Sequence, residues 1–304
     1  MTTNKFNHWR AGLLLLAVAL LPRLAWAEPL TVVTSVQPVY LIAKELLGDS
    51  VALYNLLPPG ASPHGFQMNV SQRRRLEQAD LLVWVGPGME NFLTPLVRHS
   101  NALELDTLAG IKWPEAAAEH QAADHDEHAH TGRDPHLWLS PANGQVIAEG
   151  LVAALTVLTD DAGQKADWAA RLERFSAELA ANDREWQEQL APLSEVPWLV
   201  YHDALNHFQA HFQLHPYQVI TRTPEQRPGA RHLYELRQQL QSGQCLLVEE
   251  YYPTTQAERL AEEYQLTRVS FDPLGVEAAD YTQLMHNLVD RVSVCLRAQR
   301  PAAH

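Results

Sequence analysis

Residues 196–204, VPWLVYHDA, contain the pattern from which the rest of the chain can be understood. The apolar run 198–201 is rich in aromatic and β-branched residues. It stops at the polar pair His202-Asp203, after which a helical pattern begins. A short apolar run with these flanks is typical of a buried strand. The stretch therefore predicts a β-strand that places the imidazole of His202 at its carboxyl end.

Three other segments present a metal-competent side chain in a similar way. The apolar run 266–271, LTRVSF, leads into Asp272, while His64 and His136 lie in the proline-bracketed turns SPHGF and DPHLW. Proline fixes one backbone dihedral, so both turns present their histidines with little backbone freedom. The candidate ligands for a metal are therefore His64, His136, His202 and Asp272.

The first 27 residues have the features of an export signal. Lys5 and Arg10 precede an apolar segment, 11–22, that is too short to span a bilayer, and Ala25-Trp26-Ala27 fits a small-x-small cleavage site. We expect cleavage after Ala27 and a periplasmic protein. The residue after the cleavage site, Glu28, is not cysteine, so no lipid anchor is expected there.

Charge narrows the range of partners. The signal contains three of the 23 basic residues and none of the 36 acidic ones, so the mature chain carries 20 basic and 36 acidic residues and a formal net charge of −16. So acidic a surface disfavours nucleic acid and anionic lipid as partners, and it is compatible with a cationic ligand.

The chain has two cysteines, Cys245 and Cys295. Because an exported chain enters an oxidising compartment, we expect one disulfide that closes the last domain on itself. The alternative is a pair of buried thiols, one in a strand and one in a helix.

Strand and helix patterns alternate along both halves of the chain, which predicts an α/β fold with parallel sheets covered on both faces. The first half includes an expected helix capped by Ser71 and another over residues 89–99. Between the halves, residues 163–191 form the longest periodic segment, a helix of about 43 Å at about 1.5 Å per residue. Such a helix is a stiff connector.

We therefore expect a signal peptide over residues 1–27, an N-terminal lobe over 28–160, a linking helix over 161–194 and a C-terminal lobe over 195–304. Ligands of open α/β sheets collect beyond the carboxyl ends of strands, so the four candidate ligands should face one cleft between the lobes.

Two further histidine groups compete with this set. Residues 115–133 lack apolar periodicity and are dense in acidic residues and histidine, so His120, His125, His128 and His130 could form an auxiliary, low-affinity metal site. The alternative is a solvated insertion without function. His207 and His211 are one helical turn apart and could chelate, but no carboxylate of matching phase and no HExxH motif accompanies them.

Three imidazoles and one carboxylate suit Zn²⁺, because imidazole is a borderline ligand and four groups match a tetrahedral preference. Calcium and magnesium favour oxygen ligands.

The order and spacing of several motifs resemble the zinc-specific solute-binding proteins of ABC transporters, the cluster A-I metal receptors. The motifs are GASPH (60–64), QADLLVWVGPGME (78–90), the acidic histidine-rich stretch, DPHLWLSP (134–141), YHDA (201–204), PGARHL (228–233), CLLVEE (245–250) and FDPLG (271–275). The resemblance implies two Rossmann-like α/β lobes joined by a long rigid helix, one divalent metal between them, and delivery to a membrane permease.

By the same resemblance, His64, His136, His202 and Asp272 match the ligand positions of the family. Related manganese receptors typically have glutamate at the third position, so His202 points to zinc. The cysteine pair matches a disulfide of some zinc members. Two departures stand out: Pro63 replaces a glutamate that some members use, so Asp272 or a water completes the ligand set, and Glu249-Glu250-Tyr251 replaces the usual Glu-Pro.

The expected function is therefore the periplasmic component of a zinc ABC importer, a monomer that captures Zn²⁺ and is not an enzyme. A manganese receptor, and a zinc buffer or adhesin, remain alternatives. A zinc hydrolase would need an open coordination position and a general base such as Asp203, Glu249 or Glu250. Orientation of the ligand histidines is expected from a carboxylate such as Asp203 or Asp134, or from backbone carbonyls.

Overall fold

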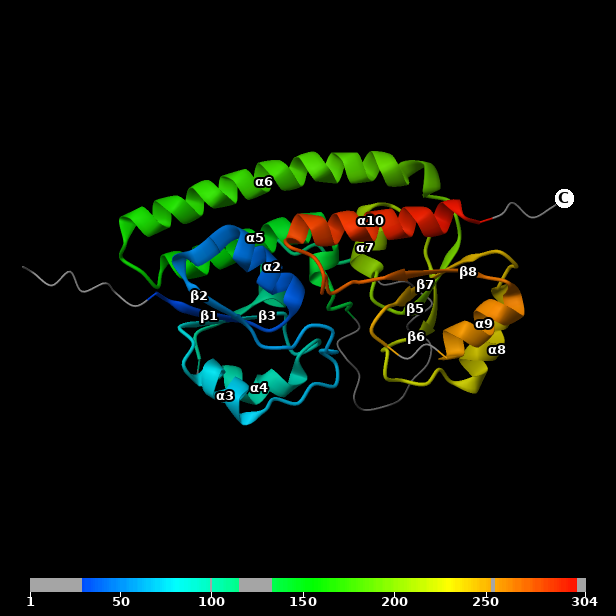
Figure 1. Cartoon of the computed structure of the whole chain (residues 1–304), viewed down its shortest axis with the longest axis horizontal. Coiled ribbons are helices and arrows are strands. Elements are labelled where there is room, and N and C mark those ends of the chain that lie inside the picture. The colour runs from blue at the N-terminus through cyan, green and yellow to red at the C-terminus, as the bar shows by residue number, and fades with distance from the viewer. Residues whose placement is uncertain (1–28, 99, 115–132, 253–254, 300–304) are drawn as a thin grey trace, which may run out of the picture.

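The computed structural model describes residues 29–98, 100–114, 133–252 and 255–299. The expected signal peptide, its cleavage site and the four histidines of the auxiliary site lie outside these residues. The described chain forms two four-stranded parallel sheets with helices packed around them (Figure 1). The predicted α/β class with two parallel sheets is confirmed.

The first sheet has the order β2-β1-β3-β4. Its strands are β1 (Thr31–Thr34), β2 (Ala52–Asn55), β3 (Leu81–Trp84) and β4 (Ala102–Glu104), and its helices are α2 (Gln37–Leu47), α3 (Val70–Glu77) and α4 (Thr94–Val97). All four residues of β3 are buried, as expected for a strand that is covered on both faces. The short edge strand β4, with the sequence ALE, contains no apolar run of the kind that predicted the other strands.

The second sheet repeats this winding with the order β6-β5-β7-β8. Its strands are β5 (Trp198–His202), β6 (Gln218–Thr221), β7 (Cys245–Glu249) and β8 (Thr267–Phe271), and its helices are α7 (Asn206–His211), α8 (Ala230–Gln239) and α9 (Thr255–Tyr264). From β5 the chain continues to β6 on one side of the sheet and then crosses to β7 on the other side. The strand order therefore reverses between β5 and β7, and the carboxyl ends of these two strands flank that point. In open α/β sheets this is the place where ligands bind.

A layer of helices extends across both sheets. The linking helix α6 (Ala162–Leu190) runs along the outside, above α5 (Pro141–Thr156), α2 and α10 (Tyr281–Arg297) (Figure 1). Its predicted apolar face is buried, including Trp168 and Trp186. One continuous apolar core contains residues of both sheets together with α2, α5, α6 and α10. The two halves are therefore joined by packed side chains as well as by the linking helix.

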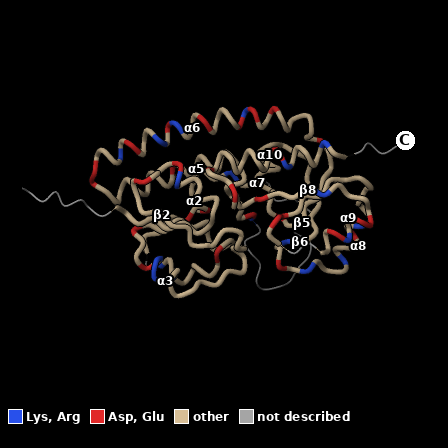
Figure 2. The backbone as a smooth tube through the Cα atoms, viewed as in Figure 1, with Lys and Arg blue, Asp and Glu red and all other residues tan. Residues whose placement is uncertain are grey.

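The exposed face of α6 carries interspersed acidic and basic residues, as Figure 2 shows. The pair Arg171–Asp167, with 2.7 Å between Nε and Oδ2, is one turn apart on this face. None of the helices in the described part of the chain is long and apolar enough to cross a bilayer.

Two local predictions were wrong. The N-cap of α3 is Asn69, not Ser71: Asn69 Oδ1 accepts the N–H of Gln72, and Gln72 Oε1 accepts the N–H of Asn69, which is a capping box. The helix expected over residues 89–99 is also shorter. It consists of a 3-10 turn, Asn91–Leu93, and the single turn α4, because the N–H groups of Met89 and Glu90 both bind the carbonyl of Gly86 in a tight turn.

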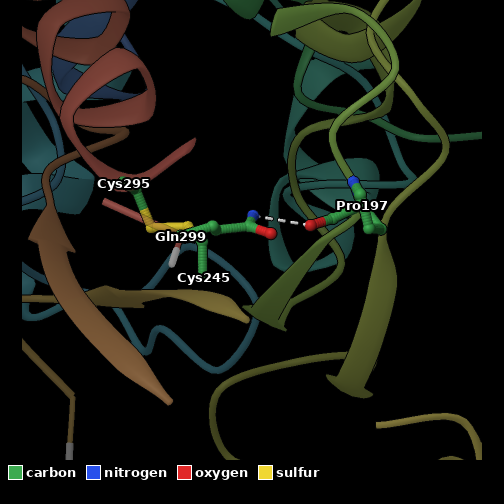
Figure 3. Close-up of a disulfide and its surroundings, with 4 residues drawn as sticks. All are labelled: Pro197, Cys245, Cys295 and Gln299. Atoms are coloured by element: carbon green, nitrogen blue, oxygen red, sulfur yellow. Dashed lines mark hydrogen bonds between the residues drawn. A yellow bond between two sulfur atoms is a disulfide. The ribbon is translucent and has the colours of Figure 1, made fainter. Parts of the chain in front are cut away.

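The predicted disulfide is present and joins Cys245 at the start of β7 to Cys295 on α10, with 5.4 Å between the Cα atoms (Figure 3). The alternative of two free thiols is therefore wrong. Beside the disulfide, Gln299 Nε2 donates to the carbonyl of Pro197 at 2.7 Å (Figure 3). Both links attach the end of α10 to the second sheet.

Candidate metal centre

Three of the four candidate ligands come together. His64, His136 and His202 each offer a ring nitrogen, and the three nitrogens lie within 4.8 Å of one another. The ring centroids are 5.2–5.5 Å apart. A tetrahedral zinc ion with bonds of about 2.1 Å places its nitrogen ligands about 3.4 Å apart, so small side-chain rotations bring the three onto one ion. No second group of three such ligands occurs among the described residues.

His202 is the last residue of β5 and is only 2% exposed. Its Nδ1 lies 3.0 Å from Oε1 of Glu249, the last residue of the neighbouring strand β7. A carboxylate accepts this hydrogen bond from Nδ1–H and thereby leaves Nε2 with its lone pair. In the described part of the chain, the buried Nε2 has no hydrogen-bond partner. A metal ion would satisfy it.

His136 precedes the 3-10 helix Leu137–Leu139 and has a similar arrangement. Its Nδ1 lies 2.6 Å from Oδ1 of Asp134, which also accepts the backbone N–H of His136 at 2.9 Å. Burial alone would raise the pKa of Asp134. The charge and hydrogen bonds of His136 outweigh this effect, so the pKa lies below its usual value and the carboxylate is ionised.

Of the two carboxylates expected to orient the histidines, Asp134 and Asp203, the first contacts a ligand histidine, and the second accepts hydrogen bonds from other residues. Asp134 holds the ring of His136. Asp203 accepts hydrogen bonds from the hydroxyl of Tyr217 at 2.8 Å and the amide of Asn206 at 2.9 Å. The partner of His202 is Glu249, to which no orienting role was assigned from the sequence. Glu249 could have been found from its position: it ends β7, the strand next to β5, at the point where the strand order reverses and ligands bind.

His64 lies in the loop between β2 and α3. Its ring packs edge-on against the rings of His136 and His202. Its backbone N–H donates to the hydroxyl of Ser62 at 3.3 Å. Unlike the other two histidines, His64 is only partly buried, so it forms the side of the centre nearest to solvent.

Asp272 follows β8 but does not belong to the group of ligand atoms within 4.8 Å. Its Oδ1 accepts the N–H groups of Leu274 and Gly275, both at 2.9 Å, and Oδ2 accepts that of Val276 at 2.6 Å. The hydroxyl of Tyr251 also donates to Oδ2, at 3.4 Å. Asp272 therefore braces the turn after β8, and a role as fourth ligand stays a prediction.

The competing pair on α7 is structural. His207 Nδ1 accepts from Nδ2 of Asn143 at 3.1 Å, and its Nε2 lies 2.9 Å from the carbonyl of Asp134. Burial is the main cause that lowers the pKa of His207, which favours the neutral ring. Because both ring nitrogens are occupied, His207 is not available to a metal.

His211 is likewise engaged within the protein. Its Nε2 lies 2.7 Å from Oδ1 of Asp183 on α6, and its Nδ1 lies 3.3 Å from the hydroxyl of Ser140, the N-cap of α5. His207 and His211 thus fasten α7 to the segment that carries His136.

Comparisons with known proteins place this chain among zinc-uptake proteins. A family model described as "ZnuA: Zinc-uptake complex component A periplasmic" matches residues 32–295. The high-affinity zinc uptake system protein ZnuA of Yersinia pestis is 30% identical over 316 residues, which cover 96% of this chain and 99% of the relative. The protein of the same name from Paracoccus denitrificans is 30% identical over 317 residues, with coverage of 93% and 96%.

Solved structures agree on the fold. A structure described as the crystal structure of ZnuA has a TM-score of 0.73 at 23% identity and covers 88% of this chain and 100% of its own. The periplasmic zinc binding protein TroA of Treponema pallidum has a TM-score of 0.70 at 17% identity, with coverage of 89% and 99%.

Proposed function

The chain belongs to the ZnuA family of periplasmic zinc-uptake components, and from that premise we propose that its three-histidine centre captures Zn²⁺ for delivery to the membrane permease of an ABC importer. The observation that carries the proposal is the buried Nε2 of His202, which has no hydrogen-bond partner among the described residues. The same side chain offers a ring nitrogen within 4.8 Å of ring nitrogens from two other histidines. A buried imidazole nitrogen without a hydrogen-bond partner is costly, and a bound cation would satisfy it.

Zinc is the cargo that this centre fits best. Neutral imidazoles suit a late divalent cation, whereas manganese favours carboxylate and carbonyl oxygens. His64, His136 and His202 would supply three bonds, and Asp272 or a water would complete a tetrahedron. His202 stands where manganese receptors of the resembled family typically have glutamate, so the manganese alternative loses support.

A hydrolytic function has little support from the geometry. A catalytic zinc needs a free general base near its open position. Oε1 of Glu249, one candidate base, lies 3.0 Å from Nδ1 of His202. Asp203, another, accepts hydrogen bonds from Tyr217 and Asn206. We propose that the protein binds and releases zinc without chemical turnover.

The family model describes a periplasmic component of a zinc-uptake complex. That description supports a periplasmic location and a membrane permease as partner, both of which we propose for this chain. Cleavage after Ala27, a monomeric mature form, and lobes over residues 28–160 and 195–304 joined by a linking helix over 161–194 are part of the same proposal. The repeated winding of the two sheets supports the division into lobes.

An uptake assay tests the proposed function. Bacterial cells that lack their own zinc receptor receive this protein with its cognate permease and ATPase, and growth is measured in zinc-depleted medium. The wild-type protein and the variant His232→Ala, which changes an exposed histidine on α8, should restore growth, whereas His202→Ala should not. Equal growth with His202→Ala would contradict the proposal.

A further inference from the structure

Two of the three histidines are fixed to one rigid block. Although Asp134 precedes α5 in the first half of the chain, Asp134 Oδ2 accepts the backbone N–H of Asn206 at 3.1 Å, and the carbonyl of Asp134 lies 2.9 Å from Nε2 of His207. Both partners belong to α7, directly after β5. The segment with His136 is therefore bound to the strand that ends in His202.

A buried tryptophan strengthens the same connection. Trp138, two residues after His136, is fully buried, and its Nε1 donates to the carbonyl of Pro273 at 2.9 Å. The hydroxyl of Tyr281, at the start of α10, donates to the carbonyl of Trp138 at 2.7 Å. A movement that separated His136 from His202 would break these buried hydrogen bonds together with the contacts to α7.

His64 is attached differently, because its loop meets the second sheet through two tyrosines that follow β7. The ring of Tyr251 lies against Gly60: a Cβ atom built on this glycine would be 3.4 Å from Cδ1 of the ring. Gly60 has φ of +74°, a conformation that glycine adopts without strain. The hydroxyl of Tyr251 also reaches Asp272, so its ring lies between the loop and the turn after β8.

Tyr252 makes the second contact. Its side chain is within hydrogen-bonding reach of Ser62, and Ser62 accepts the backbone N–H of His64. A short chain of contacts thus runs from Tyr252 through Ser62 to His64. Tyr252 also lies beside Glu249, the residue that holds the ring of His202.

We propose that Tyr251 and Tyr252 form a latch that holds the His64 loop against the second sheet and so sets the rate at which the metal leaves. Release then proceeds by movement of the His64 loop while His136 and His202 stay in place. The inference rests on the proposed function, because it assigns the residues that control release from the same centre. Both tyrosines lie outside the set of proposed ligands, so their loss should change the rate of release and not the number of bound ions.

The test measures zinc dissociation from the mature chain loaded with one equivalent of Zn²⁺. The loaded protein is mixed in a stopped-flow instrument with an excess of a chromophoric chelator, and the release rate is followed by absorbance. Tyr251→Ala and Tyr252→Ala should each release zinc about tenfold faster than the wild-type protein. The matched control is Tyr234→Ala, an exposed tyrosine on α8 that should release zinc at the wild-type rate.

Conservative variants keep the test valid if an alanine variant does not fold. Tyr252→Phe removes its polar contact with Ser62, and the loss of one such contact corresponds to roughly a fivefold change in rate. Ser62→Ala removes the same contact together with the acceptor of the His64 N–H, so it should speed release at least as much. The double variant should be no faster than Ser62→Ala alone. Release rates that equal that of Tyr234→Ala, or effects that multiply in the double variant, would overturn the latch.

The zinc content of the tyrosine variants, measured beside that of His202→Ala, distinguishes a failure of the latch from a failure of the proposed function. If the tyrosine variants bind one zinc and release it at the wild-type rate, the latch is wrong and the centre stands. If His202→Ala also keeps its zinc, the centre itself is wrong, and with it the latch.

Discussion

The carboxylates behind the ligand histidines give the centre its electrostatic balance. Asp134 contacts Nδ1 of His136, and Glu249 contacts Nδ1 of His202. Both carboxylates are buried, where an unpaired charge is costly. These two carboxylates would offset the double charge of a bound zinc ion. The same hydrogen bonds hold the rings in the orientation that a metal requires.

Glu249→Gln tests this role. Glutamine keeps the size of the side chain and can accept a hydrogen bond from His202, but it removes the charge. Zinc affinity, measured by competition with a chelator of known affinity, should fall by about 10- to 100-fold. The control is Glu250→Gln, which neutralises the exposed neighbour and should leave the affinity close to wild type. Equal affinities in the two variants would remove Glu249 from the centre.

Zinc binding should depend on pH because proton and metal compete for the same nitrogen. Burial opposes protonation of His202, but the charge and hydrogen bond of Glu249 outweigh it, so the pKa of His202 lies above the usual 6.5. A raised pKa means that the proton binds at higher pH. Titrations between pH 8 and pH 5.5 should therefore show a falling affinity that begins above pH 6.5.

The charge of Glu249 is what raises the pKa of His202. In Glu249→Gln the zinc affinity should therefore begin to fall at a lower pH than in the wild-type protein. A wild-type affinity that stays constant from pH 7.5 to 5.5 would contradict a centre made of three imidazoles.

The histidines were predictable because each one occupies a local position that sequence reveals. His202 ends an apolar strand, while His64 and His136 each directly follow a proline. Asp134 was predictable because it is two residues from its partner. Glu249 was not predicted as the partner of His202, since the two are 47 residues apart and meet only through the order of the strands.

A disulfide holds the strand β7 to the helix α10. The disulfide Cys245–Cys295 closes a segment with a sequence separation of 50 residues, and both cysteines are fully buried. Closing a loop of this length removes about 4 kcal/mol of chain entropy from the unfolded state. The link also fixes the strand that carries Glu249 to the helical layer.

Replacement of both cysteines by alanine should lower the free energy of unfolding by about 2–4 kcal/mol. Guanidinium unfolding curves of the oxidised wild-type protein and the double variant measure the difference. Reduction of the wild-type protein should shift its midpoint toward that of the double variant and leave the variant unchanged. Coincident curves for all forms would show that the disulfide carries no stability.

The helix predicted over residues 89–99 was wrong because of a turn. The pattern over residues 89–99 favours a helix, but the carbonyl of Gly86 binds the N–H groups of Met89 and Glu90 in a turn instead. Glu90 then points back into the protein, where its carboxylate accepts hydrogen bonds from Ser35 and Gly86. Burial raises the pKa of Glu90 to about 7. Periodicity does not reveal a polar side chain that is buried by its own turn.

The two halves of the molecule are more closely joined than a pair of lobes on a single connector. The alternation of strands and helices predicted two parallel sheets, and the long apolar stripe predicted α6. The contacts of α10 and of the turn before it were not predictable, because they join segments far apart in sequence. Lys44 on α2 donates to the carbonyl of Ala279 in that turn at 3.3 Å, and the apolar core continues from α2 into α10. The boundaries of the lobes stay a prediction.

We expect zinc to bind between the two sheets and not in the histidine-rich segment. Elemental analysis of protein purified without chelator tests it most directly, with three forms of the chain compared: residues 28–304, the same chain without residues 115–130, and His202→Ala. The first two forms should each carry about one zinc ion per chain, and the third should carry little. Zinc that disappears with residues 115–130 and persists in His202→Ala would place the binding site in the histidine-rich segment instead.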